Sequence, residues 1–79
     1  MSNLENYNNI FMETLGIEES QLKGLAYQGV PNWDSVRHMA LVAALEETFD
    51  IMMETDDIID FSSYEKGIEI IKSKYNVEL

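Results

Sequence analysis

The sequence predicts an all-α protein: a small bundle of three main helices and one short helix, with a long loop between the first two main helices. Apolar residues recur at three- and four-residue spacing in three segments, at about 3–15, 35–49 and 63–75, which is the pattern of one helix face. No segment shows the apolar–polar alternation of a half-buried strand. The 79 residues are short enough for one domain, 1–79.

Composition narrows the class of protein further. The net charge is −10, from 15 acidic and 5 basic residues, so the surface repels nucleic acids and anionic membranes and attracts basic protein patches. At 46% hydrophobic residues the chain is too apolar for a disordered acidic tail. No apolar run reaches the ~18 residues of a membrane span, and the first residues do not form a signal peptide. We therefore expect a cytoplasmic monomer without nucleic-acid partners.

The first helix is expected over about residues 3–15. Ser2 and Glu5 match a capping box before it, and Gly16 is suited to the left-handed turn after it. The loop at 17–33 contains two glycines and the only proline, yet it is rich in apolar residues. It should therefore pack over the core, with a short helical turn at about 20–25.

The second helix is expected over about residues 35–49, with Asp34 or Ser35 as its cap. A helical wheel separates its apolar residues into two arcs. The arc expected to face the core contains Leu41, Val42, Leu45 and Phe49. The other arc, which we call the apolar strip, contains Val36, Met39, Ala40 and Ala43. Two interpretations remain open: the strip is an exposed docking site, or the loop at 17–33 covers it.

A short third helix is expected at about 56–60 and a fourth at about 63–75. Ser62 and Glu65 match a capping box, Gly67 weakens the fourth helix slightly, and Asn76 is suited to a left-handed turn after it. The expected stripe of the fourth helix is Tyr64, Ile68, Ile71 and Tyr75. The expected core of the whole bundle is Leu4, Tyr7, Phe11, Leu15, Leu41, Val42, Leu45, Phe49, Ile51, Ile68 and Ile71.

Catalysis and metal binding find little support. Asp34, Ser35 and His38 are the residue types of a hydrolytic triad, but all lie within about one helical turn, with no second element for an oxyanion hole. The acidic run around Asp56 and Asp57 lacks the alternating acids, glycine and final glutamate of a calcium loop. We therefore expect no enzyme and no metal site. His38 and Trp33 are expected to pack as partly buried and buried residues.

Ser35 admits a functional interpretation besides that of a cap. At the first turn of a helix, unpaired backbone N–H groups favour an anion, so a phosphate esterified to this serine would be stabilised there. The negative charge of Asp34 would oppose it, and Arg37 could offset Asp34.

The sequence around Ser35 and the helical segment after it resemble those of an acyl carrier protein. Asp34-Ser35-Val36 is similar to the Asp-Ser-Leu motif of that family, and "MALVAALEETFDI" and "DDIIDFSSYEKGIEII" resemble the family's second helix and its third and fourth helices. The resemblance extends over essentially the whole chain, and it implies a single carrier domain with an acyl-carrier-protein-like fold.

The resemblance also implies a chemistry. Ser35 would carry a covalent 4′-phosphopantetheine arm, transferred from coenzyme A by a phosphopantetheinyl transferase with Mg²⁺, and Asp34 would assist through the metal site of that enzyme. The thiol of the arm would hold an acyl or aminoacyl group as a thioester, which agrees with the absence of cysteine from the chain. In this family the acyl group is shielded among the helices, here near residues such as Leu45, Ile58 and Ile71.

The chain departs from housekeeping fatty-acid carriers just after the serine. It has Arg37, His38 and Ala40 where those carriers are typically acidic, and retains Glu46 and Glu47 farther along. Changed charge is a common means of partner specificity. We therefore expect a specialised carrier of fatty-acid, polyketide or polysaccharide biosynthesis, loaded by an adenylating ligase or acyltransferase. Enzymes with basic patches would dock on Val36, Arg37, Met39, Ala40, Ala43, Glu46 and Glu47. The alternative is a helical interaction domain without a prosthetic group.

Overall fold

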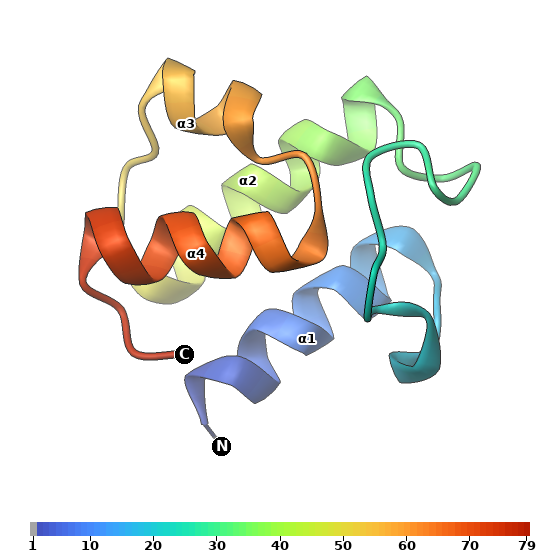
Figure 1. Ribbon diagram of the computed structural model, residues 1–79, viewed down its shortest axis with the longest axis horizontal. Helices are drawn as coiled ribbons and strands as arrows, with labels where there is room; N and C mark the ends of the chain where they lie inside the picture. Colours follow the sequence, from blue (N-terminus) through green and yellow to red (C-terminus); the bar gives the residue numbers. More distant parts are fainter. Residues whose placement is uncertain (1) are drawn as a thin grey trace.

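The computed structural model describes residues 2–79 and confirms the all-α prediction. Within that range, four helices, α1 (Asn3–Leu15), α2 (Ser35–Phe49), α3 (Thr55–Asp60) and α4 (Tyr64–Tyr75), are accompanied by a single 3₁₀ turn, η1 (Glu19–Gln21). The described residues form no strand, and their only β-type pairing is an isolated bridge between Ala26 and Ser63. The long α1–α2 loop occupies one side of the molecule, and the start of α1 and the C-terminus lie toward the other (Figure 1).

Local signals place the ends of α1 and α2. Ser2 and Glu5 form the expected capping box, and Gly16 ends α1 in the left-handed conformation at φ 65°. Asp34 caps α2: its Oδ1 accepts a hydrogen bond from the Arg37 backbone N–H at 2.9 Å. Asp50 ends α2 with φ 54°, a conformation that aspartate tolerates better than most residues.

The predicted capping box of α4 is wrong by one residue. Ser63, not Ser62, is the cap, and its hydroxyl accepts the Lys66 backbone N–H at 3.0 Å. The backbone carbonyl of Ser62 is instead bonded to the Tyr27 N–H at 2.8 Å, which ties the turn to the long loop. Asn76 ends α4 in the left-handed conformation, as expected.

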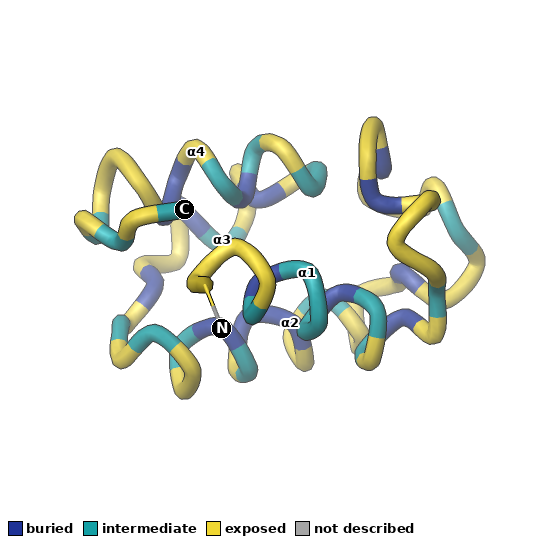
Figure 2. The backbone as a smooth tube through the Cα atoms, turned by 90° about the horizontal axis from the view of Figure 1, so that it is seen from below, coloured by how far each residue is buried: buried dark blue, intermediate teal, exposed yellow. Residues whose placement is uncertain are grey.

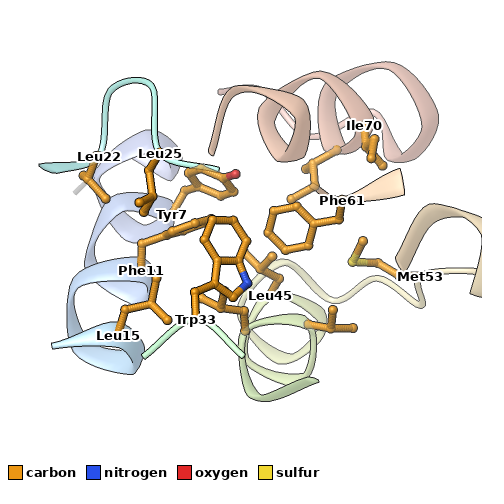
Figure 3. Packing of buried hydrophobic residues seen from close by; sticks show 13 residues of the cluster. Tyr7, Phe11, Leu15, Leu22, Leu25, Trp33, Leu45, Met53, Phe61 and Ile70 are labelled. Carbon is orange, nitrogen blue, oxygen red and sulfur yellow. The ribbon is translucent and has the colours of Figure 1, made fainter. Parts of the chain in front are cut away.

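Aromatic rings fill the centre of the core. Trp33 is fully buried, and its indole lies 5.5 Å from the Phe11 ring and 6.0 Å from the Phe61 ring, measured between centroids. Figure 3 shows this group surrounded by apolar side chains from α1, α2 and α4 and from the segments between helices. The buried hydrophobic residues are Tyr7, Phe11, Leu15, Leu22, Leu25, Trp33, Leu41, Val42, Leu45, Met53, Phe61, Ile70 and Ile71.

One predicted core residue of α1 is wrong. Leu4 is 36% exposed, whereas Tyr7, Phe11 and Leu15 are fully buried. At about 100° per residue, the eleven residues from Leu4 to Leu15 place these two side chains only about 20° apart around the helix. Leu4 therefore lies on the same face as the buried residues, and its exposure goes with its position in the first turn of α1. Phe49, Ile51 and Ile68 are partly buried and pack against the core from outside.

The buried face of α4 is rotated from the predicted stripe. Gly67, Ile70 and Ile71 are its buried residues, whereas Tyr64, Ile68 and Tyr75 are only partly buried. A Cβ added at Gly67 would lie 2.2 Å from the Tyr7 hydroxyl oxygen and 2.4 Å from the nearest Phe61 ring carbon. The glycine thus provides the contact surface of α4, a role that its effect on helix propensity alone did not indicate.

The long loop is held at several points and packs over the core as expected. Leu22 and Leu25 are buried, and the Leu25 carbonyl accepts the Tyr64 N–H at 2.8 Å. Asn32 donates from its side-chain amide to the Leu15 carbonyl at 2.9 Å. The helical turn expected at 20–25 is shorter and earlier, at Glu19–Gln21. In Figure 2 this side of the molecule shows buried positions within a mainly exposed segment.

None of the helices in residues 2–79 has both the length and the apolar character that a membrane crossing needs.

Candidate functional site

The candidate site begins at Ser35, the first residue of α2. Ser35 and the capping residue Asp34 are both exposed. The hydroxyl of Ser35 is not needed as the cap, because the carboxylate of Asp34 performs that role through Oδ1. Within residues 2–79 no partner is seen for the other carboxylate oxygen of Asp34. The serine is therefore accessible to a modifying enzyme, and it lies beside a carboxylate that has one oxygen available for another interaction.

Arg37 has a structural partner that the sequence did not indicate. Its Nη1 donates to the Thr14 carbonyl at 2.6 Å, near the end of α1. A cation is favourable there because the last carbonyls of a helix lack intrahelical partners. Arg37 is still exposed, and it fixes the start of α2 against the end of α1.

His38 is held at both ring nitrogens, in a partly buried position as expected. The Trp33 indole N–H donates to Nδ1 at 3.1 Å, and Nε2 lies 2.9 Å from the Ile58 carbonyl oxygen. An indole N–H can only donate, so Nδ1 is the acceptor, and the neutral ring carries its proton on Nε2 and donates to Ile58. This chain of hydrogen bonds joins the residue before Asp34 to α3.

The apolar strip is exposed. Val36 is 75% exposed and Met39 52%, and Ala40 and Ala43 also face solvent. The interpretation in which the loop at 17–33 covers the strip is wrong, because that loop is anchored to the end of α1 and the start of α4. On the opposite arc Leu41, Val42 and Leu45 are buried, as the wheel predicted.

Acidic residues border the strip toward the end of α2. Glu47 and Asp50 are exposed, and Glu46 is partly buried. Glu46 is partly engaged within the molecule, because its Oε2 accepts the Met53 backbone N–H at 2.8 Å. The strip and its border thus combine apolar surface with negative charge, which is the combination that fits a partner with apolar and basic residues.

A pocket of about 210 Å³ lies between the start of α2 and α3, and we call it the α2–α3 pocket. It is lined by Tyr27, His38, Ile58, Ile59, Phe61 and Ser62. His38 is three residues after Ser35, and residues at this spacing lie about 5–6 Å apart on one helix face. Of the residues named above for acyl shielding, Ile58 lines this pocket, whereas Leu45 and Ile71 are fully buried in the core.

The acidic run in α3 includes one buried carboxylate, at Asp57, which is 2% exposed. It accepts hydrogen bonds from the Lys74 ammonium and the Tyr75 hydroxyl, each at 2.5 Å. These bonds, that from Lys74 foremost, hold the pKa of Asp57 below its ordinary value. No cluster of three potential metal-ligating side chains is found in residues 2–79. Asp57 therefore serves to hold α3 against the end of α4.

Sequence reasoning missed three of the residues around the pocket. Tyr27, Phe61 and Ser62 come from loops, where helical periodicity carries no information about which side chains meet. The available signal was the unusual content of large apolar residues in the loop at 17–33, which indicated packing without indicating a partner.

Comparisons with known proteins do not assign a family to the chain. No model of a known protein family matches the chain, and no curated protein matches it.

Proposed function

We propose that the protein is a carrier whose Ser35 bears a 4′-phosphopantetheine arm, and that the fold is of the acyl-carrier-protein kind. One observation carries the proposal. The Ser35 hydroxyl is exposed in the first turn of a 15-residue helix, where Asp34 provides the cap and an exposed apolar strip adjoins it. A serine used only as a cap would be at position 34.

The site fits the group. The N-terminal end of α2 carries the positive end of the helix dipole, which favours the phosphate of a phosphodiester. Exposure of Ser35 leaves room for a bulky substituent. When bound, the arm supplies a thiol that forms thioesters, and this chain has no cysteine of its own.

Attachment would follow from these positions. The Ser35 oxygen attacks the phosphorus of coenzyme A that bears the pantetheine, its proton passes to base or solvent, and adenosine 3′,5′-bisphosphate leaves. Asp34 holds the helix start with one carboxylate oxygen, and its other oxygen would be available to the Mg²⁺ of the transferase. The apolar strip and its acidic border receive the transferase and the pathway enzymes.

The arrangement after the serine supports a specialised carrier. Arg37 and His38 replace acidic surface with a cation tied to α1 and a ring tied to α3. A partner enzyme whose basic patch binds acidic residues at these positions would meet a surface of different charge here. We propose an adenylating ligase or acyltransferase as the loading enzyme, and monomeric action in the cytoplasm.

The direct test is attachment. The protein is incubated with coenzyme A, Mg²⁺ and a phosphopantetheinyl transferase of broad specificity, and its intact mass is measured. Wild type and Ser20→Ala, which removes another exposed serine, should each gain one arm, whereas Ser35→Ala should gain none. An unmodified, folded wild type, or a modified Ser35→Ala, would contradict the proposal.

A second variant separates the two roles of Asp34. Asparagine is as good a helix cap as aspartate, so Asp34→Asn should leave thermal stability almost unchanged while removing the charge that assists the transferase. The attachment rate should fall by at least ~10-fold, a size that corresponds to a loss of about 1.4 kcal/mol in transition-state binding. An unchanged rate would limit Asp34 to capping.

The exposed strip also supports a second candidate, a helical interaction domain without an arm. It explains the exposed Val36 and Met39 but assigns no role to Ser35 beside a capping Asp34. The attachment experiment distinguishes the two, because an interaction domain stays unmodified.

A further inference from the structure

A pair of side chains spans the start of α2, one on each side of Ser35 in the sequence. The indole Nε1–H of Trp33 donates to Nδ1 of His38 at 3.1 Å, and the two rings are stacked with centroids 6.1 Å apart. Trp33 directly precedes Asp34, and His38 follows Ser35 by three residues. We call this pair the Trp33–His38 bridge. The segment between its two ends contains the proposed attachment site.

Both ends of the bridge are anchored in the molecule. Trp33 is fully buried at the aromatic centre of the core (Figure 3). His38 Nε2 lies 2.9 Å from the Ile58 carbonyl oxygen of α3, and the backbone N–H of His38 donates to the Asp34 carbonyl at 2.8 Å. The chain therefore leaves the core at Trp33, passes through the exposed Asp34 and Ser35, and is fixed again at His38.

The exposed bonds at the site are weaker constraints than this bridge. The Asp34 cap and the side-chain bond of Arg37 both lie in exposed positions. Water competes for such bonds, and helix ends fray. Fraying of the first turn of α2 would change the direction of the Ser35 hydroxyl. The Trp33–His38 bridge opposes fraying, because opening it would leave the buried indole N–H without an acceptor.

The bridge also explains the type of residue at position 38. One side chain there accepts a hydrogen bond from Trp33 and donates another to Ile58, and a neutral imidazole does both. Asparagine can reproduce only the first bond, because its side-chain oxygen takes the place of Nδ1. Glutamine can reproduce only the second, because its side-chain nitrogen takes the place of Nε2. The two substitutions therefore separate the bond to Trp33 from the bond to α3.

We propose that His38 is a positioning residue for arm attachment: through Trp33 it fixes the turn at Asp34 and Ser35 in the orientation that the transferase requires. This inference rests on the proposed attachment at Ser35. His38 acts on the attacking oxygen only through the bridge and does not touch the reacting atoms. A displaced nucleophile reacts slowly even in a bound complex, because the reacting atoms must be aligned.

The position of His38 on α2 separates this role from docking. At about 100° per residue, His38 lies roughly 100–160° around the helix from each residue of the apolar strip. Loss of the bridge should therefore lower the kcat of attachment, while the KM, which depends on docking at the strip, should change little.

The test compares three substitutions of His38. His38→Asn retains an acceptor for Trp33, His38→Gln retains only the donor to Ile58, and His38→Phe retains neither. With coenzyme A, Mg²⁺ and the transferase of broad specificity, kcat and KM are measured well below the melting temperature of each protein. His38→Asn should keep kcat within about threefold of wild type, whereas the other two should lower it by at least ~10-fold with KM changed less than about threefold.

The indole of Trp33 gives an independent readout, because it is the only tryptophan in the chain. Its side-chain N–H signal in an NMR spectrum of ¹⁵N-labelled protein reports the hydrogen bond to position 38. In wild type and His38→Asn this proton should exchange slowly with solvent. In His38→Gln and His38→Phe it should exchange several-fold faster, so that kcat follows the protection of the indole across the four proteins.

Val42→Ala is the matched control for stability. Val42 is buried on α2 and is not part of the bridge, so this variant should melt below wild type and retain its kcat. A wild-type kcat in His38→Phe, a kcat that does not follow indole protection, or a Val42→Ala as slow as His38→Phe overturns the positioning role alone. Failure of the folded wild type to gain an arm overturns the proposed function as well.

Discussion

The two faces of α2 have nearly the same chemistry and different surroundings. On the inner face Leu41, Val42 and Leu45 are buried, and on the outer face Val36 and Met39 are mostly in water. Only the inner face contributes to folding through burial, because apolar surface stabilises a fold in proportion to the area removed from water. The outer apolar residues therefore require another explanation, and a docking surface next to Ser35 provides one.

The largest expected effect is on the inner face. Leu45→Ala should lower the free energy of unfolding by about 2–5 kcal/mol, because it removes a fully buried side chain and leaves a cavity. In a domain of this size such a loss lowers the melting temperature by roughly 10 °C or more. Thermal and denaturant unfolding followed by circular dichroism would measure it. If Leu45→Ala lost no more free energy of unfolding than a variant at an exposed residue of α2, the two faces would not differ in their contribution to stability.

The buried carboxylate of Asp57 makes a contribution to stability that depends on pH. Bonds from Lys74 and Tyr75 hold the pKa of Asp57 below its unfolded value of about 3.9, so they stabilise the fold above that value. The stabilisation is lost as the pH falls through the lower, folded pKa. Asp57→Asn should therefore melt below wild type at pH 7, and the difference should shrink in acid below about pH 4. A difference that is constant from pH 7 to pH 3 would contradict this assignment.

The smallest stability effect is expected on the outer face. Met39→Ser and Val36→Ser should each change the free energy of unfolding by no more than about 0.5 kcal/mol, because both residues are mainly exposed. The same variants should raise the KM of the transferase for the protein if the apolar strip is the docking surface. Unchanged kinetics with both variants would remove the strip from the proposed interface.

Much of the fold followed from local signals in the sequence. The bounds of α1 and α2, the cap at Ser2 and the left-handed turns at Gly16 and Asn76 each depend on a few neighbouring residues. The two arcs of α2 followed from helical geometry alone.

Other features depend on which segments meet in space, and these could not be predicted. Gly67 lets Tyr7 and Phe61 contact the backbone of α4 and rotates its buried face. Phe61 was not expected in the core because it belongs to the turn between α3 and α4, outside any periodic stretch. For the same reason the ring-lined pocket was not anticipated, whereas the position of Asp34 and Ser35 at the start of α2 was.

The account depends most on the position of the arm, and fragmentation mass spectrometry measures that position directly. The protein is modified by the transferase, digested and sequenced, with the phosphopantetheine mass as the marker. We predict that the added mass lies on the peptide containing Asp34 and Ser35 and that fragment ions assign it to Ser35. An arm found on Ser20, Ser62 or any other residue, or on none in a folded sample, would contradict the account.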